Sequence, residues 1–93
     1  MIRSFADRET HRVFNRLPSR RYHPQLVHRA LRKLIILDAA GTLDDLRRPP
    51  GNRLEALAGS RKGQHSIRVN DQYRICFRWA PDGPEDVEIT DYH

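Results

Sequence analysis

The hydrophobic residues of this chain change their spacing at about residue 52, and this change constrains the fold more than any other feature of the sequence. Before that point, apolar residues recur at steps of three and four, as they do on one face of a helix. After it, they alternate with polar residues, as they do on one face of a strand. Helices followed by a meander of short strands are typical of an α+β fold, with the helices packed on one face of an antiparallel sheet.

Two helices are expected in the first half of the chain. Residues 6–17 place their apolar side chains near one helical face, with acidic residues in the first turn and Arg16 in the last, which complements the helix dipole. The second helix begins at Pro24, a residue suited to the first helical position, and its apolar stripe consists of Val27, Ala30, Leu31, Leu34 and Leu37. Gly41 is expected to cap it.

A short helical turn and then strands should follow. Thr42 and Asp45 have the spacing of a capping box, and residues 49–51 (PPG) end that turn. Strands are expected at residues 1–5, 54–57, 66–69, 73–79 and 87–92, with Asn70 and Asp71 forming a hairpin turn. Without an internal repeat or a linker, residues 1–93 should form a single domain.

The charge is unevenly distributed along the chain. The net charge is +5, but residues 1–79 are strongly basic, whereas residues 80–93 contain five acidic residues and no Lys or Arg. A basic body indicates either a nucleic-acid partner or an acidic protein partner. The chain begins without the apolar run of a signal peptide, and its single cysteine, Cys76, is expected to be a buried strand residue, so we expect a cytoplasmic protein with no membrane segment.

The polar face of the predicted meander carries the first candidate functional residues. If Ile67, Phe77 and Ile89 face the core, the residues that project the other way are Arg68, Arg74, Arg78 and Tyr92. Guanidinium groups can contact phosphates in a bidentate way, and a phenol ring can stack on a base. An ordinary solvated face of an antiparallel sheet would have the same pattern, so both interpretations remain open.

The histidines offer proton-transfer chemistry but no metal site. His93 ends the chain directly after Tyr92, and it is either a frayed terminal residue or an acid–base group that titrates near neutral pH. His65, at the start of a strand, either lies on the surface or contacts a base. Neither the histidines nor Cys76 have metal-ligand spacing, and no glycine-rich phosphate loop is present. We therefore expect no metal and no cofactor, and any phosphodiester cleavage should use the 2′-hydroxyl of RNA.

The order of short motifs resembles a known family. These motifs are residues 1–5 (MIRSF), 37–40 (LDAA), 43–47 (LDDLR), 49–57 (PPGNRLEAL), 63–72 (GQHSIRVNDQ), 74–77 (RICF), 87–89 (VEI) and 91–93 (DYH), with Gly59 and Arg61 between them. Together they resemble the HigB toxins of the RelE/ParE superfamily, also called plasmid-maintenance or proteic killer proteins. The resemblance covers essentially the whole chain.

This resemblance implies a microbial RNase fold and cleavage of mRNA in the A site of the 70S ribosome. It assigns Tyr92 and His93 to the catalytic end, Arg74 to the arginine of the sheet, and Asp91 to the same terminal motif. Some family members have a histidine in the place of Glu55 and a lysine in the place of Ala58, so the division of acid and base roles is open. Glu55 is either a base or a salt-bridge partner of Arg53 or Arg61. The expected RNA-binding residues are Arg53, Arg61, Lys62, His65, Arg68 and Arg78.

The resemblance also implies a partner and leaves competing functions. The partner is a HigA-like antitoxin with a helix-turn-helix domain, which would make the contacts of the complex with operator DNA. ParE-like proteins of the same superfamily instead inhibit DNA gyrase without catalysis. A third possibility is a non-catalytic RNA-binding module. The terminal Tyr92 and His93, together with Arg74, favour the ribonuclease.

Overall fold

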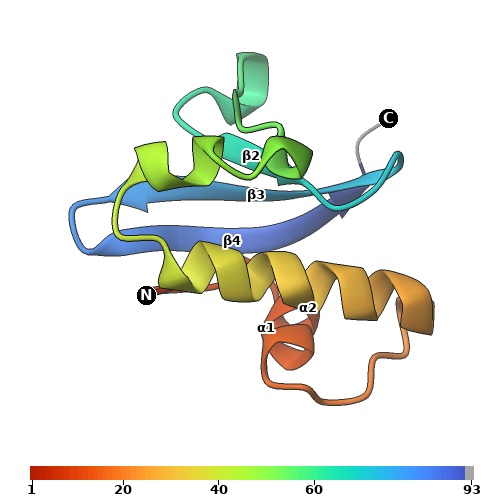
Figure 1. Cartoon of the computed structure of the whole chain (residues 1–93). Helices are drawn as coiled ribbons and strands as arrows, with labels where there is room; N and C mark the ends of the chain where they lie inside the picture. Colours follow the sequence, from red (N-terminus) through yellow and green to blue (C-terminus); the bar gives the residue numbers. More distant parts are fainter. Residues whose placement is uncertain (92–93) are drawn as a thin grey trace.

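A computed structural model describes residues 1–91 of the 93-residue chain. Figure 1 shows two helices under a twisted sheet, which confirms the predicted α+β class. The elements in chain order are α1 (Arg8–Phe14), α2 (Pro24–Ala39), the 3-10 turns η1 (Leu43–Arg47) and η2 (Pro50–Asn52), β1 (Glu55–Ala56), the 3-10 turn η3 (Gly59–Arg61), β2 (His65–Arg68), β3 (Tyr73–Ala80) and β4 (Gly83–Asp91).

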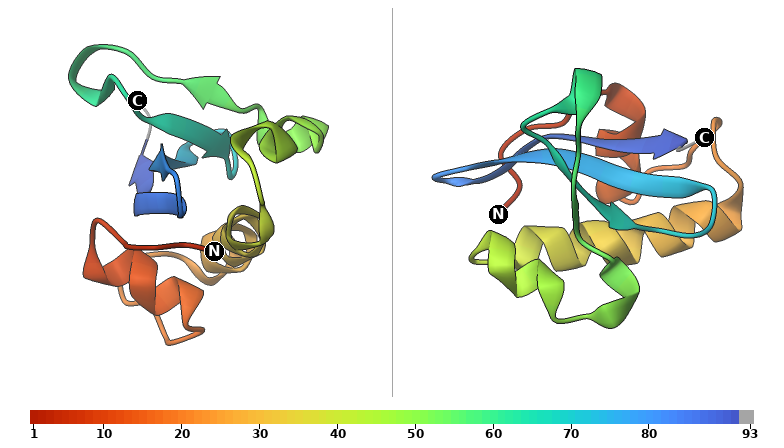
Figure 2. Two further views of the ribbon diagram at one scale, coloured as in Figure 1. Left: turned by 90° about the vertical axis from the view of Figure 1, so that its left-hand side faces the viewer. Right: turned by 90° about the horizontal axis from the view of Figure 1, so that it is seen from above.

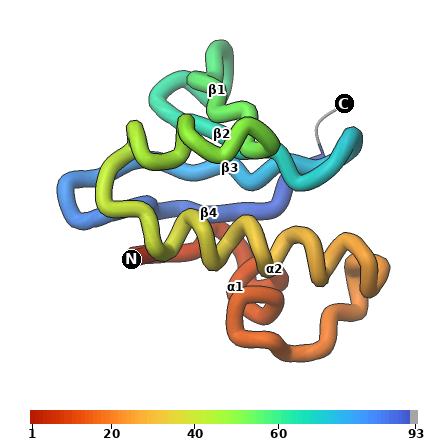
Figure 3. The backbone as a smooth tube through the Cα atoms, viewed as in Figure 1, coloured from red at the N-terminus to blue at the C-terminus, as the bar shows by residue number. Residues whose placement is uncertain are grey.

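The four strands form one antiparallel sheet in the order β1-β2-β3-β4. The short strand β1 lies beyond β2, at the edge of the sheet farthest from the two helices (Figure 3). Ile67 on β2 pairs with Ile75 on β3, which pairs with Ile89 on β4, and all three side chains are buried. This row faces the helices, so the alternate side chains of each strand face the other way.

Helix α2 supplies most of the helical side of the core. His23 caps it, because its Nδ1 accepts a hydrogen bond from the backbone N–H of Gln25 (3.2 Å), and Pro24 occupies the first turn. The buried side chains recur at steps of three and four: Leu26, Ala30, Leu34 and Leu37. Burying one such leucine completely stabilises the fold by about 1.5–3 kcal/mol. Figure 2 shows α1 and α2 on the same side of the sheet.

Helix α1 is shorter than the 6–17 segment predicted from the sequence. Asp7 caps it by accepting a hydrogen bond from the N–H of Thr10 (2.6 Å). The hydroxyl oxygen of Thr10 is fully buried and accepts a hydrogen bond from the N–H of Ile89 (2.9 Å), which fastens α1 to β4. Arg16 adopts a left-handed conformation just after the helix and ends it early.

The prediction of a strand at residues 1–5 is wrong. The segment runs beside β4 and forms only one isolated parallel bridge, Phe5 with Val87. The N–H groups of Arg3 and Ala6 donate to the carbonyls of Pro84 and Val87, but the N–H of Ile2 donates to the Asp38 carboxylate (2.8 Å) rather than to a strand. The irregular backbone at Asp86, where φ is 53°, interrupts a regular ladder on β4.

The prediction that Gly41 caps α2 is also wrong. The C-cap is Ala40 in an extended conformation, and Gly41 does not adopt a positive φ. The N–H groups of Gly41 and Thr42 both donate to the Asp45 carboxylate (3.0 Å each), while the N–H of Asp45 donates to the Thr42 hydroxyl. The predicted capping box of η1 is therefore confirmed. Its Asp45 carboxylate also accepts a hydrogen bond from Gly41, the residue that was expected to cap α2.

Candidate functional site

Arg74 of β3 is the centre of the polar cluster on the outer face of the sheet, the face turned away from α1 and α2. Its Nε donates to the Ser66 hydroxyl (2.7 Å), and its Nη2 donates to the backbone carbonyl of Arg53 (2.6 Å). The carboxylate of Glu55 lies 3.6 Å from the same Nη2. Only 11% of the Arg74 side chain is exposed, so these partners fix the orientation of a charged and mostly buried group.

Strand register explains why these groups meet. Glu55 on β1 pairs with Ser66 on β2, and Arg68 of β2 pairs with Arg74 of β3. Alternation along β2 places Ser66 and Arg68 on the same outer face as Arg74. Arg53, just before β1, adopts a left-handed conformation (φ 44°), and its carbonyl accepts the Arg74 hydrogen bond. A cross-strand alignment therefore assembles the cluster from three strands and one turn.

Asp91 ends β4 near this cluster. It pairs with Tyr73, one residue before Arg74, and its carboxylate accepts a hydrogen bond from the side-chain amide of Gln72 (3.1 Å). The structure thus brings Arg74 and Glu55 into contact and puts Asp91 at the end of the adjacent strand. The predicted catalytic residues Tyr92 and His93 lie outside the described residues.

The connection between β1 and β2 lies over the outer face, and two of the expected RNA-binding arginines, one in this connection and one on β3 below it, lie near acidic partners. Arg61 donates to Glu88 of β4 (2.6 Å), an ion pair whose side chains are about one third and one quarter exposed. Arg78 of β3 lies 3.7 Å from the Asp86 carboxylate. At Gly63, where φ is 94°, a Cβ atom would lie only 3.0 Å from the Arg78 guanidinium, so glycine lets the connection approach β3.

Three other expected RNA-binding residues also lie in or near this region. Arg68 contacts Asp71 in the hairpin turn, and the side chains of Arg53 and Lys62 are exposed. Exposed ion pairs contribute only about 0–1 kcal/mol each, so an arginine in such a pair can exchange a carboxylate for a phosphate at little cost. The described surface is therefore a set of cations, several of them held near acidic side chains.

His65 lies on the opposite side of the sheet from Arg74. It alternates with Ser66 and shares the core-facing side of β2 with Ile67. Its ring stacks on Phe77, with 6.3 Å between ring centroids. The structure therefore does not bring His65 together with the arginines of the outer face.

Sequence reasoning did not identify the groups that hold Arg74. Ser66 is fully buried, and the alternation of polar and apolar residues does not indicate its hydrogen bond with Arg74. The other acceptor is the backbone carbonyl of Arg53, which the side-chain types in a sequence cannot reveal. Thr90 pairs with Arg74 across the sheet, and within residues 1–91 its buried hydroxyl oxygen has no hydrogen-bond partner. These contacts join residues 8 to 21 positions apart in sequence, so they depend on the strand register.

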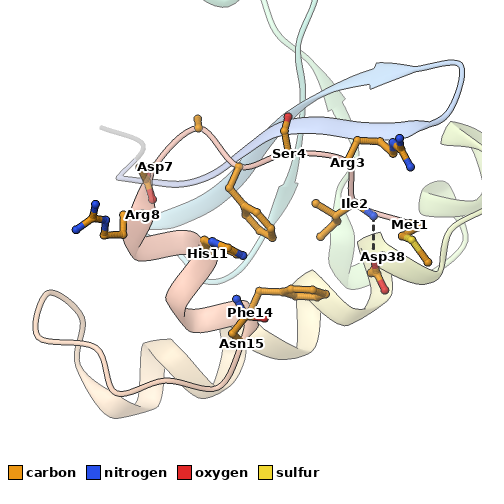
Figure 4. A pocket seen from close by; sticks show the side chains of 12 residues that line it. Met1, Ile2, Arg3, Ser4, Asp7, Arg8, His11, Phe14, Asn15 and Asp38 are labelled. Atoms are coloured by element: carbon orange, nitrogen blue, oxygen red, sulfur yellow. Dashed lines mark hydrogen bonds between the residues drawn. The ribbon is translucent and has the colours of Figure 1, made fainter.

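A separate cleft at the N-terminus contains none of the predicted site residues. It lies among the first eight residues, α1 and the end of α2, where His11, Phe14 and Asp38 line it (Figure 4). The dashed line in Figure 4 is the hydrogen bond from the Ile2 N–H to Asp38. Within residues 1–91, no three His, Cys, Asp or Glu side chains are placed to hold a metal ion, and no helix is long and apolar enough to cross a membrane.

Two helices on a four-stranded antiparallel sheet, in a small basic chain, are the arrangement found in RelE-like toxins. The chain belongs to the HigB family of these proteins: residues 3–93 match the model of a RelE-like toxin of type II toxin-antitoxin system HigB. It is 48% identical over 81 residues to Toxin HigB-1 of Vibrio cholerae serotype O1, covering 86% of this chain and 85% of that protein. It is also 44% identical over 48 residues to an uncharacterized protein of Haemophilus influenzae, covering 52% and 48% of the two chains.

Proposed function

We propose that this toxin stops translation by cutting mRNA in the A site of the 70S ribosome. The observation that best supports this is the Arg74 guanidinium, which is mostly buried and fixed by Ser66 and the Arg53 carbonyl on the basic outer face of the sheet. A cation that is oriented before the substrate arrives stabilises charge that develops in a transition state. Membership of a family of type II toxins supports the same function.

The proposed reaction is an attack of the RNA 2′-oxygen on the neighbouring phosphorus. The new P–O2′ bond replaces the P–O5′ bond, which leaves a 2′,3′-cyclic phosphate on one fragment and a 5′-hydroxyl on the other. Arg74 neutralises the charge on the phosphate, and His93 acts as the acid or the base. Tyr92 stacks on a base or orients the reacting group, Glu55 is a possible base, and Asp91 orients His93 or an arginine.

The remaining basic side chains hold the RNA in this proposal. They contact phosphates of mRNA and rRNA, and the ribosome aligns the mRNA backbone for the attack. The set consists of Arg53, Arg61, Lys62, Arg68 and Arg78; His65 is not part of it, because its ring stacks on Phe77 on the core-facing side of β2. Since each phosphate contact releases counterions, binding should weaken steeply as salt is raised.

We propose a HigA-like helix-turn-helix protein as the antitoxin. The family implies an antitoxin partner, because a type II toxin is neutralised by a protein. In the proposed complex the antitoxin makes the contacts with operator DNA, and the toxin acts in the cytoplasm, where translating ribosomes are found. An open reading frame of antitoxin size next to this gene would support the pairing.

The experiment that tests the proposal compares mRNA alone with mRNA on translating ribosomes. Mapping of RNA 5′ ends should reveal new ends only when ribosomes are present. His93→Ala should abolish these ends and growth arrest while ribosome binding stays largely intact. Undiminished cleavage by that variant would exclude the role of His93, and gyrase-linked DNA breaks without RNA cleavage would favour the gyrase inhibitor instead.

A further inference from the structure

A pocket of about 880 Å³ lies between the beginning of α2 and the turn that joins β2 to β3. Both segments lie at the same end of the molecule in Figures 1 and 2. The side chains that give the pocket its character are Arg21, Tyr22, His28, Arg29 and Tyr73. It contains none of the arginines assigned to RNA on the outer face of the sheet.

Two tyrosine rings form the wall of this pocket. Tyr22 and Tyr73 meet edge to face with 5.9 Å between ring centroids, and the Arg21 guanidinium lies 5.8 Å from the Tyr22 ring centroid. Burial raises the pKa of the Tyr22 phenol, so it stays a neutral hydrogen-bond donor at physiological pH. Aromatic rings beside a guanidinium are a combination that suits the stacking of nucleic-acid bases.

The segment that supplies Arg21, Tyr22, His28 and Arg29 has no acidic side chain. Residues 10–37 contain seven Lys or Arg and no Asp or Glu. The acidic side chains of the preceding segment are already engaged: Asp7 accepts a hydrogen bond from the Thr10 N–H, and Glu9 accepts one from the Ser19 hydroxyl. Asp71 in the adjoining turn is paired with Arg68, and within residues 1–91 the side chains that line the pocket include Arg21 and Arg29 but no carboxylate, so the lining favours an anion.

The pocket borders the end of the strand that leads to the proposed catalytic residues. Gln72 lines it, and the Gln72 side chain donates to Asp91 at the end of β4 (3.1 Å). An RNA strand that passes the end of β4 can therefore reach the pocket with a neighbouring nucleotide. Charge alone would suit an acidic peptide equally well, but a peptide carboxylate makes no use of the paired tyrosine rings.

We propose that this pocket is a second RNA-binding site, which takes one nucleotide of the RNA away from the bond that is cut. The base lies against the Tyr22 and Tyr73 rings, and Arg21 and Arg29 hold its phosphates. The site rests on the proposed function in one respect only, which is that the toxin engages RNA. It adds affinity and fixes the path of the strand without taking part in proton transfer.

The test measures binding of a fluorescent single-stranded 2′-O-methyl oligoribonucleotide, which cannot be cut by attack of a 2′-hydroxyl. The double variant Arg21→Gln/Arg29→Gln is compared with Arg20→Gln/Arg32→Gln, which removes the same charge from the same part of the chain outside the pocket. We expect the pocket variant to bind about tenfold more weakly, with the control within about threefold of wild type. The slope of log affinity against log salt should become shallower by about 1.4, since each lost phosphate contact on a single strand contributes about 0.7.

A second pair of variants tests the tyrosine wall. Tyr22→Leu removes the ring and should weaken binding by about fivefold, whereas Tyr22→Phe keeps it and should stay within about twofold of wild type. An acidic peptide of equal charge should bind with no difference between these two variants. Thermal unfolding of each variant checks that the fold is intact.

Three results would overturn the second site: no binding of the oligonucleotide by wild-type protein, equal losses in the two double variants, or equal sensitivity of the peptide and the RNA to Tyr22→Leu. Cleavage on translating ribosomes is measured separately. If wild-type protein cleaves mRNA and the pocket variant binds the oligonucleotide no more weakly than the control variant, the second site alone is refuted. Pocket-dependent binding without cleavage refutes the proposed function alone.

Discussion

Replacement of Ser66 by alanine tests whether the orientation of Arg74 matters for catalysis. The Ser66 hydroxyl is fully buried and accepts the 2.7 Å hydrogen bond from Arg74 Nε. A hydrogen bond to a charged group contributes about 1.5–3 kcal/mol, and each 1.4 kcal/mol or so of lost transition-state stabilisation slows a reaction about tenfold. If the whole interaction is felt in the transition state, kcat should fall about ten- to a hundredfold. The affinity for ribosomes should change little, because the guanidinium keeps its charge.

The same substitution should also lower the stability of the fold, because Arg74 is left with one fewer acceptor in a mostly buried position. Even about 1.5 kcal/mol would lower the Tm of a domain of this size by roughly 6 °C or more. The assays are single-turnover cleavage on programmed ribosomes and thermal unfolding. Ser60→Ala, which removes an exposed hydroxyl from η3, is the control. Unchanged kcat in Ser66→Ala, with the same KM as wild type, would refute the idea that this contact prepares Arg74 for the reaction.

The other predictions concern the fold around the site. Leu34→Ala should destabilise the protein by about 2–5 kcal/mol in chemical denaturation, because Leu34 is fully buried in the core; a smaller loss would mean a looser core. Thr42→Ala should cost about 1 kcal/mol through loss of the N-cap of η1, and an unchanged denaturation midpoint would contradict the capping role. Hydrogen bonds from the Thr42 and Gly41 N–H groups lower the pKa of Asp45, so its carboxylate stabilises the fold at neutral pH; this contribution is lost as pH falls below about 3.8, and Asp45→Asn should flatten that part of the acid unfolding curve. A double-mutant cycle of Arg61→Gln and Glu88→Gln should give a coupling of about 1 kcal/mol that shrinks in 1 M salt, and zero coupling would show that the pair does not hold the connection over the sheet.

Sequence periodicity was sufficient to predict the main elements because burial imposes it. The stripe on α2 and the alternation on β3 persist over several residues, and the structure places both elements at the predicted positions, although Leu26 is buried where Val27 was expected. The last strand was predicted too short, since β4 begins at Gly83, four residues before residue 87. At the N-terminus the same reasoning failed, since five residues of weak alternation do not reveal that Asp38 takes the Ile2 N–H. The prediction that Gly41 caps α2 failed for a similar reason, because the Asp45 carboxylate, four residues later, accepts a hydrogen bond from the Gly41 N–H.

The candidate site could be predicted only in part. Arginines at alternate positions indicated one basic face, and strand register does place Arg68 and Arg74 side by side. The sequence suggested Arg53 or Arg61 as the salt-bridge partner of Glu55, whereas Arg61 pairs with Glu88 and Glu55 lies near Arg74. Such contacts depend on the path of the connection between β1 and β2, which no local pattern specifies.

The chemistry of the RNA ends tests the central claim most directly. Ribosome-bound mRNA cut by the purified toxin should yield fragments with a 2′,3′-cyclic phosphate and a 5′-hydroxyl, and a single 2′-deoxynucleotide at the cut position should block the cut there. Arg74→Ala should slow the same reaction about a hundred- to a thousandfold, as loss of a fixed charge-stabilising donor does. Efficient cleavage of the 2′-deoxy substrate, or fragments that carry a 5′-phosphate, would contradict attack by the RNA hydroxyl.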